Sequence, residues 1–451
     1  MLSNLKLNSS LTAYIKLFIF AVITQNLLYF YFFPGGQLGR ILQLIFILVT
    51  IFILFDAAYK DRKVTVDISF IEINPFIIIF IGLVPFSFLV GYLSGNLSLE
   101  LNPYQLIDYT RSAFSSRVIS RSFNEIFILI YYFFFFYFLT YLLVNKKDSI
   151  NFFFKVFKVI FITHMFCGYL DWILYQLFYF DLFSRHLYEG VHIGSRWHGI
   201  AGEPRQASVY MAFGISVIYL ESFYKGTKFN PWWLIATVPA IFLTVSFTSM
   251  ISIAIMFLLL LPVLIFVLLK NPFLSFIFFI SISILLYIAF TNSRIAEYAE
   301  LLSTVFVVID TGSALPFKIR MQMGEIFPLY DQYKAFAESD YMPLMFGSGL
   351  GTSAINNYSY VDHSDAFGNP NSQIIRSIYE SGVLGTAIFI IIFYWPIISN
   401  KKLSFNKKLE LYVFTSVVLA FSLGVRSPAI FIYLGMLSSI LSNNLYFKEN
   451  E

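Results

Sequence analysis

The stretch IFILIYYFFFFYFLTYLLV, residues 126–144, decides the fold, because it carries no charge and is long enough to cross a bilayer as a helix. Several runs of this kind occur, and the chain is 58% hydrophobic and 12% charged. Soluble proteins average roughly 45–50% apolar and about 25% charged residues. Long apolar runs favour helices over the short alternating segments of a transmembrane barrel. The sequence therefore predicts an all-α polytopic membrane protein, with residues 1–451 as a single integral membrane domain.

About twelve transmembrane helices are expected, with Pro and Gly at many of the turns between them. We place them at residues 12–33, 39–59, 73–93, 125–144, 156–180, 206–223, 231–248, 250–269, 273–291, 372–398, 410–424 and 428–446. The mixed segment 94–124 is predicted to be an interfacial helix. The first apolar stretch is too long for a signal-peptide core and is expected to remain as the first span.

Basic residues predict the orientation, because short cytoplasmic loops are enriched in Lys and Arg. With the N-terminus inside, the lysine-rich segments that face the cytoplasm are 60–63, 145–147, 225–228, 270 and 401–408. Both termini are then cytoplasmic. Residues 181–205 form an external loop, and residues 292–371 form a large external loop between helices 9 and 10. Arginines collect on the external side, where they either bind phosphate oxygens through their planar fork or extend to lipid headgroups.

The first candidate motif is GSRWHGIAGEPRQ, residues 194–206, in the shorter external loop. Its chemically active side chains are Arg196, His198, Glu203 and Arg205. Pro204 suits the first turn of the helix that follows, and a helix N-terminus beside arginines is a ready anion site. The alternative is a solvated loop with a helix cap. Nothing resembling a metal-ligand pattern accompanies the histidines, so no metal is expected.

The second candidate motif spans the large external loop and the start of the next helix. Its polar residues are Arg320, Asp362, His363, Asp365, Asn371, Arg376 and Glu380. The glycine-rich stretch FGSGLG, residues 346–351, lacks the Lys-Ser/Thr of a nucleotide-binding P-loop. His363 is either a proton-transfer group or an exposed loop residue. Arg376 and Glu380 share a helix face, so they neutralise each other or hold a guanidinium group for a diphosphate.

Two further ionisable residues, His164 and Asp171, lie seven residues apart in the fifth predicted span, on roughly one helix face. They form a buried structural pair or line a groove for a lipid. The only cysteine, Cys167, excludes an internal disulfide and is expected to be a packing thiol. The net charge of +4 is small and no nucleic-acid motif is present, so no nucleic-acid partner is expected.

These motifs resemble the signature of the bacterial O-antigen polymerases and O-antigen ligases. Those families have an Arg before a glycine-rich turn, a His-Asn pair and a Glu-x-Gly-x-x-Gly run, with an Arg…Glu-Pro segment in the preceding external loop. The matching residues are Arg320, FGSGLG at 346–351, ESGVLG at 380–385 and RWHGIAGEP at 196–204. This chain has Asn371-Ser372 where the ligases have His-Asn, which favours the polymerases.

The resemblance implies a C-type-like glycosyltransferase of the bacterial inner membrane, with a periplasmic site and without metal or cofactor. Its substrate would be an undecaprenyl-diphosphate-linked oligosaccharide, and its partners the lipid bilayer and a chain-length regulator protein. On this basis the predicted catalytic residues are His363, Arg320 and Glu203. The predicted substrate-binding residues are Arg196, His198, Arg205, Asn371, Arg376 and Glu380. The alternatives are an O-antigen ligase, a lipid-linked oligosaccharide flippase and, more remotely, a cell-wall polymerase of the shape and division class.

Overall fold

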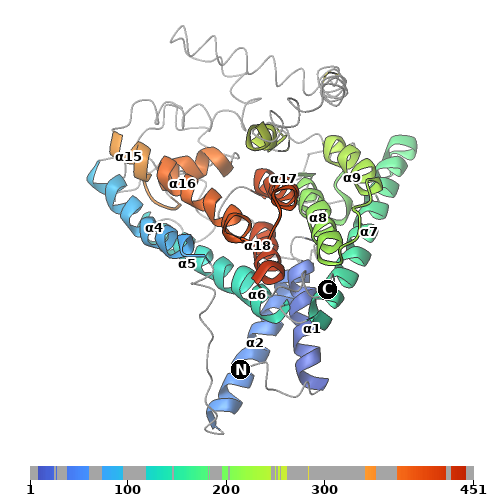
Figure 1. The fold of residues 1–451 in the computed structure, drawn as a ribbon, viewed down its shortest axis with the longest axis horizontal. Helices are drawn as coiled ribbons and strands as arrows, with labels where there is room; N and C mark the ends of the chain where they lie inside the picture. The colour runs from blue at the N-terminus through green and yellow to red at the C-terminus, as the bar shows by residue number, and fades with distance from the viewer. Residues whose placement is uncertain are drawn as a thin grey trace.

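The computed structural model describes residues 9–24, 27, 38–59, 74–94, 118–144, 147–180, 182, 196–201, 204–244, 249, 252–253, 255–261, 283, 341–351, 373–422 and 428–442. Within these segments every regular element is a helix (Figure 1), so the all-α prediction is confirmed for the part of the chain that is described. The helices are α1 (Ser9–Ile23), α2 (Leu38–Tyr59), α4 (Phe76–Leu93), α5 (Val118–Tyr131), the π-helix η2 (Tyr132–Phe138), α6 (Leu139–Val144), α7 (Lys147–Phe178), the 3-10 turn η3 (Gly199–Ala201), α8 (Pro204–Tyr224), α9 (Trp232–Leu243), α15 (Tyr341–Phe346), α16 (Gln373–Ser399), α17 (Phe405–Ser422) and α18 (Pro428–Ser442).

Five described helices are long and apolar enough to cross a membrane, judged by length and composition. They are Phe76–Leu93, Phe123–Val144, Asp148–Phe178, Pro204–Tyr224 and Ser377–Ser399. Shorter apolar helices coincide with the first, second, seventh and last predicted spans. The predicted spans at 250–269 and 273–291 lie largely outside the described residues. The predicted interfacial segment 94–124 does too, except that its last residues, from Val118, belong to α5.

Helix α7 is arranged as a helix in lipid would be, with polar groups on its inward face. The exposed face carries Val159, Ile162, Phe166, Ile173 and Leu177. The buried face carries Phe157, Phe161, His164 and Asp171. A helix on the surface of a soluble protein shows the opposite division. The prediction that His164 and Asp171 share a face is confirmed, because both are buried on the same side of α7.

The centre of the bundle is aromatic where α18 packs on η2. Phe431 of α18 is fully buried, and its ring centroid lies 4.9 Å from that of Phe133 and 5.6 Å from that of Tyr132. Phe389 of α16 approaches the same ring, with centroids 6.2 Å apart. Consecutive aromatic residues point in several directions around a helix, so such a run is stable where neighbours or lipid surround it.

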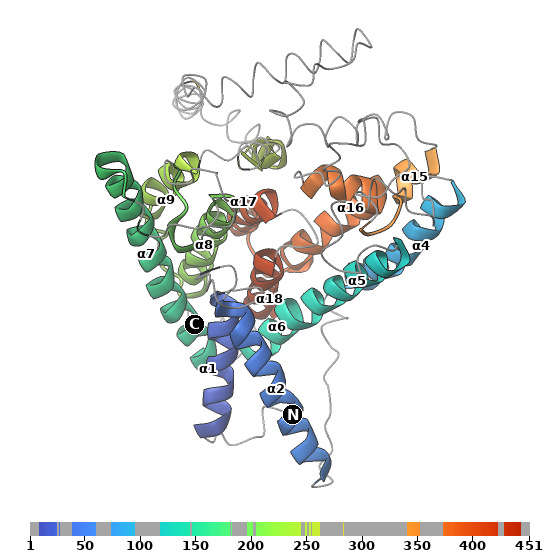
Figure 2. The ribbon, with the colours of Figure 1, turned by 180° about the vertical axis from the view of Figure 1, so that it is seen from behind.

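The helices form two groups that are separated by α17 and α18. Helices α4, α15 and α16 lie toward one side of the molecule, and α7, α8 and α9 toward the other, as Figures 1 and 2 show from opposite directions. The Tyr219 hydroxyl donates to Oε2 of Glu410 over 2.6 Å and joins the end of α8 to the start of α17. The lysine-rich loops 225–228 and 401–408 therefore lie at one end of the molecule, as the predicted orientation requires.

Candidate functional site

Residues 196–201 of the first motif pack among α7, α8 and α9 instead of projecting away from them. The Trp197 N–H donates to the Leu243 carbonyl over 2.9 Å, and Nε of Arg196 donates to the Thr244 carbonyl over 3.2 Å. These carbonyls lie at the end of α9, where a helix lacks its own donors. The Trp197 side chain is fully buried against His164, with ring centroids 5.2 Å apart. The segment therefore supplies hydrogen-bond donors to the last carbonyls of α9, and its Trp197 side chain packs against α7.

Two glycines make room for this segment. A Cβ at Gly168 of α7 would collide with the Trp197 indole. Gly199 has φ +53°, and a Cβ there would lie 2.6 Å from Cε1 of His164. Both positions therefore require glycine, the first for close approach and the second also for its backbone conformation.

His164 fixes the inner end of the segment. Its Nδ1 accepts the Ile200 N–H over 3.2 Å, which assigns the remaining ring hydrogen to Nε2 in the neutral imidazole. Tyr210 of α8 packs edge-on to the same ring, with centroids 5.0 Å apart. This imidazole therefore holds the loop in place as an acceptor within the bundle.

Asp171 and His198 form a second buried contact beside it. Nε2 of His198 lies 3.3 Å from Oδ2 of Asp171, and both side chains are almost fully shielded from solvent. Nδ1 of His198 lies 3.0 Å from the Gly199 carbonyl oxygen, and the Leu182 N–H donates to Oδ1 of Asp171 over 2.6 Å. Both imidazole nitrogens thus lie close to protein oxygens. The two side chains are therefore packed against one another inside the bundle.

The two arginines of the first motif are more exposed to solvent than the described residues between them. Arg196 and Arg205 remain partly exposed, whereas Trp197 and His198 are buried. Helix α8 begins at Pro204, as predicted, so Arg205 lies in its first turn. The Ser249 hydroxyl donates to Ser208 over 2.7 Å and connects that turn to the chain beyond α9. The first motif thus places Arg205 in the first turn of α8 and Arg196 beside the end of α9.

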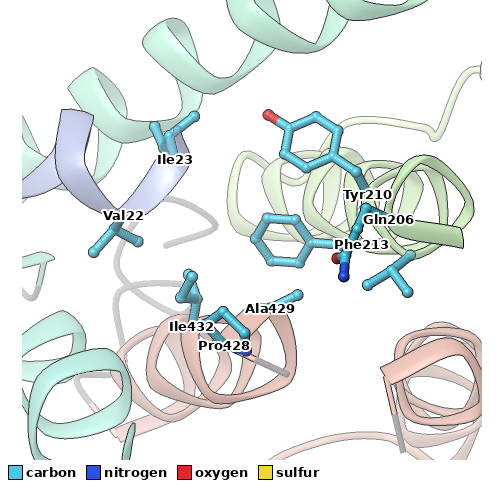
Figure 3. A pocket seen from close by; sticks show the side chains of 9 residues that line it. Val22, Ile23, Gln206, Tyr210, Phe213, Pro428, Ala429 and Ile432 are labelled. Atoms are coloured by element: carbon cyan, nitrogen blue, oxygen red, sulfur yellow. The ribbon is translucent and has the colours of Figure 1, made fainter. Parts of the chain in front are cut away.

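A narrow cavity lies behind the first turns of α8, between α8, α1 and α18 (Figure 3). Its volume is about 10 Å³, and its lining is apolar apart from Gln206 and Tyr210. Such a space holds about one water molecule. It is therefore too small for a sugar or a prenyl chain.

The second motif contains an unusual glycine-rich turn. Gly347, Gly349 and Gly351 have φ of +84°, +102° and +80°, a region that residues with a Cβ rarely adopt. The Gly347 N–H donates to the Pro343 carbonyl over 2.7 Å. The turn therefore reverses the chain directly after α15.

The turn bonds to a break in α16. Gly382 has φ +70° and ψ 176°, which interrupts the helix and opens the carbonyls just before it to other donors. The Ser348 and Gly349 N–H groups donate to the carbonyls of Tyr379 and Glu380, each over 2.9 Å. Three consecutive N–H groups of the turn are thus bonded to protein carbonyls. The turn is therefore a packing element, and its backbone is not arranged to receive a phosphate.

Glycines in the turn and in the helices that it contacts allow this close packing. A Cβ at Gly347 would lie 2.5 Å from the Gly382 nitrogen, and one at Gly349 would lie 2.8 Å from Cα of Phe88 in α4. A Cβ at Gly91, also in α4, would lie 2.5 Å from the Ser348 carbonyl oxygen. The turn is therefore clamped between α4 and α16.

The remaining predicted site residues are only partly within the described structure. His363, Arg320, Glu203 and Asn371 lie outside the described residues. Arg376 lies in the first turn of α16, where the structure describes its backbone but not its side chain. Glu380 is buried at the break in α16, so its carbonyl has a clear structural role. The described parts of the two motifs belong to the separate helix groups seen in Figures 1 and 2.

Sequence reasoning missed two partners that the structure places at these motifs. The first is the contact of Asp171 with His198, for which the only signal was that both are ionisable residues near the same predicted membrane face. The second is Gly91, whose close contact with the turn has no signal in a single sequence. Among the described residues, no group of three or more His, Cys, Asp or Glu side chains is placed to hold a metal ion.

No protein-family model, curated protein or solved structure matches the chain. The resemblance therefore rests on the motif residues themselves.

Proposed function

We propose that the chain is a membrane glycosyltransferase that joins undecaprenyl-diphosphate-linked oligosaccharide units, as a polymerase of O-antigen or a related surface polysaccharide. The observation that supports this most is the packing of Gly347 against Gly382. These glycines belong to the two separate parts of the signature, FGSGLG and ESGVLG. The backbone of FGSGLG hydrogen-bonds to the backbone beside ESGVLG. The occurrence of both sequences in one chain therefore has a structural reason and is less readily explained by chance.

The charge distribution around the first motif suits a diphosphate. Arg205 is partly exposed in the first turn of α8, where the helix dipole also favours an anion, and Arg196 is partly exposed beside the end of α9. Arginine binds phosphate oxygens bidentately and stays charged where it is partly buried. We therefore assign these two residues to the donor's diphosphate, together with Arg320 and Arg376.

The proposed reaction is a glycosyl transfer. An acceptor hydroxyl oxygen attacks the anomeric carbon of the donor sugar, and the bond between that carbon and the diphosphate oxygen breaks. The diphosphate leaves with the bonding electrons, and the guanidinium groups stabilise its charge. The hydroxyl proton passes to a base, for which His363 is our first candidate and the carboxylate of Glu203, in the first motif, is the second.

We further propose that the reaction takes place on the periplasmic face of the inner membrane, with both termini in the cytoplasm. The lysine-rich loops that share one end of the molecule support this orientation. The donor supplies the energy of the reaction, so an external site needs no nucleotide.

Deletion of the gene and analysis of the surface glycan test the proposal. A polymerase deletion leaves single repeat units on the lipid A-core. A ligase deletion leaves undecorated core while lipid-linked polymer accumulates, and a flippase deletion traps single lipid-linked units inside. An unchanged polymer ladder on the deletion strain would exclude all three. Polymer formation by the purified protein from lipid-linked repeat units is the direct assay.

A further inference from the structure

A cavity of about 280 Å³ lies at the end of α8 that is opposite to the first motif. Helix α8 has 21 residues, so this cavity and Arg205 in its first turn are about 30 Å apart, close to the thickness of a hydrocarbon core. The charged residues that line it are Lys158, Glu221, Lys225 and Lys228. Their formal charges sum to a net positive lining, so the cavity favours an anion.

Glu221 organises two of these lysines. It is buried, and its Oε2 lies 2.8 Å from Nζ of Lys158 while its Oε1 lies 2.7 Å from Nζ of Lys225. The two lysine side chains remain 39% and 44% exposed. An ammonium group has three N–H donors, and Glu221 takes one from each. Glu221 thus holds both ammonium groups at the lining of the cavity.

The neutral lining adds a further donor. The side-chain oxygen of Asn230 accepts the Trp232 N–H over 3.1 Å, which leaves the amide nitrogen of Asn230 as a donor. Trp233 also lines the cavity, and Trp side chains concentrate at the headgroup level of membranes. Lys158 lies about three turns inside α7, whereas lysines that only set topology occupy loops. The cavity is therefore built from three segments of the chain.

We propose that this cavity binds a phosphate group, supplied by the headgroup of an acidic phospholipid or by a soluble phosphate. Lysine binds phosphate as a point charge, and basic pockets between transmembrane helices are typical sites for acidic headgroups. The site is separate from the proposed glycosyl transfer and does not depend on it.

The test uses the purified full-length protein in nanodiscs of phosphatidylcholine, with phosphatidylglycerol added at increasing fractions and bound lipid counted by native mass spectrometry. Wild-type protein should retain phosphatidylglycerol over phosphatidylcholine. Lys228→Gln should weaken that retention roughly fivefold, the effect expected for one lysine near the lipid surface. Lys401→Gln is the matched control, because this exposed lysine lies at the same end of the molecule but does not line the cavity.

A second arm identifies the source of the phosphate. Inorganic phosphate or glycerol 3-phosphate is titrated against the same protein in phosphatidylcholine alone, and thermal unfolding is followed. Stabilisation by the soluble anion that is lost in Lys228→Gln assigns the cavity to a free phosphate. Retention of phosphatidylglycerol without that stabilisation assigns it to a headgroup. Equal weakening by both lysine variants, or no response to lipid or anion, would overturn the proposal.

Discussion

Gly347 and Gly382 approach so closely that a Cβ on the first would lie 2.5 Å from the backbone nitrogen of the second. Gly347 lies in the turn directly after α15, and Gly382 breaks α16. The contact therefore holds this turn against α16, and it needs glycine on both sides.

Gly382→Ala should lower the thermal unfolding temperature of the detergent-purified protein. Its φ and ψ lie in a region that is essentially restricted to glycine, and occupying it costs about 1–3 kcal/mol before the collision with Met345 is counted. Gly82→Ala is the control, because a Cβ at Gly82 meets nothing within 4 Å and Ala is favoured in a helix by up to about 1 kcal/mol. If both variants unfold at the wild-type temperature, the clamp does not contribute to stability.

The pair of Asp171 and His198 should behave as a coupled unit. Asp171→Asn and His198→Gln each remove one member of a buried polar contact, and a buried polar group that loses its partner costs about 1–3 kcal/mol. The double variant should be less destabilised than the sum of the single variants, as measured by thermal unfolding. Strict additivity would show that the two side chains do not interact.

Arg196 and Arg205 are expected to bind the diphosphate through the planar guanidinium group, which a lysine cannot replace. Arg205→Lys and Arg196→Lys keep the charge but lose bidentate binding, so polymer should largely disappear while the protein remains in the membrane at normal abundance. Arg40→Lys, on the exposed surface of α2, should leave the glycan ladder unchanged. The same loss is expected for Arg320→Lys. Wild-type ladders from an arginine variant would remove that residue from the diphosphate site.

The proposed base is tested by His363→Ala. Turnover of purified lipid-linked repeat units should fall by roughly 10²–10⁴-fold, as is typical for the loss of a general base, with little change in donor binding. His198→Ala is the comparison, because His198 is buried against Asp171 and should affect stability first. Near-normal turnover in His363→Ala together with collapse in a folded His198→Ala would move the base to the first motif.

Orientation can be tested with single cysteines in a Cys167→Ser background. A cysteine at Ser359, in the predicted large external loop, should react with a membrane-impermeant thiol reagent added to the periplasmic face. A cysteine at Ser404, which is exposed in the lysine-rich loop before α17, should not react from that face. The reverse labelling pattern would invert the topology and move the proposed site to the cytoplasm.

Helix positions could largely be predicted from the sequence, because a span requires a long apolar run and a recognisable end. Pro204 marks the first residue of α8 for this reason. The π-helical segment η2 could not be predicted, because its hydrophobic pattern is continuous with that of α5 and α6. The pattern records how apolar a segment is, but not how its backbone hydrogen bonds are spaced.

The residues of the candidate site could be predicted from the sequence, but the contacts between them could not. The seven-residue spacing of His164 and Asp171 predicts a shared face, and that face is observed. Their partners come from an irregular loop, whose path depends on space left by glycines in other elements. The turn at Gly347 resembles a family signature, yet its packing role depends on α4, which lies far away in the sequence.

Helix α7 has 32 residues and is about 48 Å long, which exceeds the roughly 30 Å of a hydrocarbon core. The distance along it from Lys158 to Phe178 is about 30 Å, so an apolar layer of that thickness would fit between these two residues. Asp171 would then lie about 10 Å from the boundary at Phe178. Shorter acyl chains would bring Asp171 and His198 closer to water, whereas longer chains would require α7 to tilt less. Hydrophobic mismatch thus acts directly on the depth of this pair.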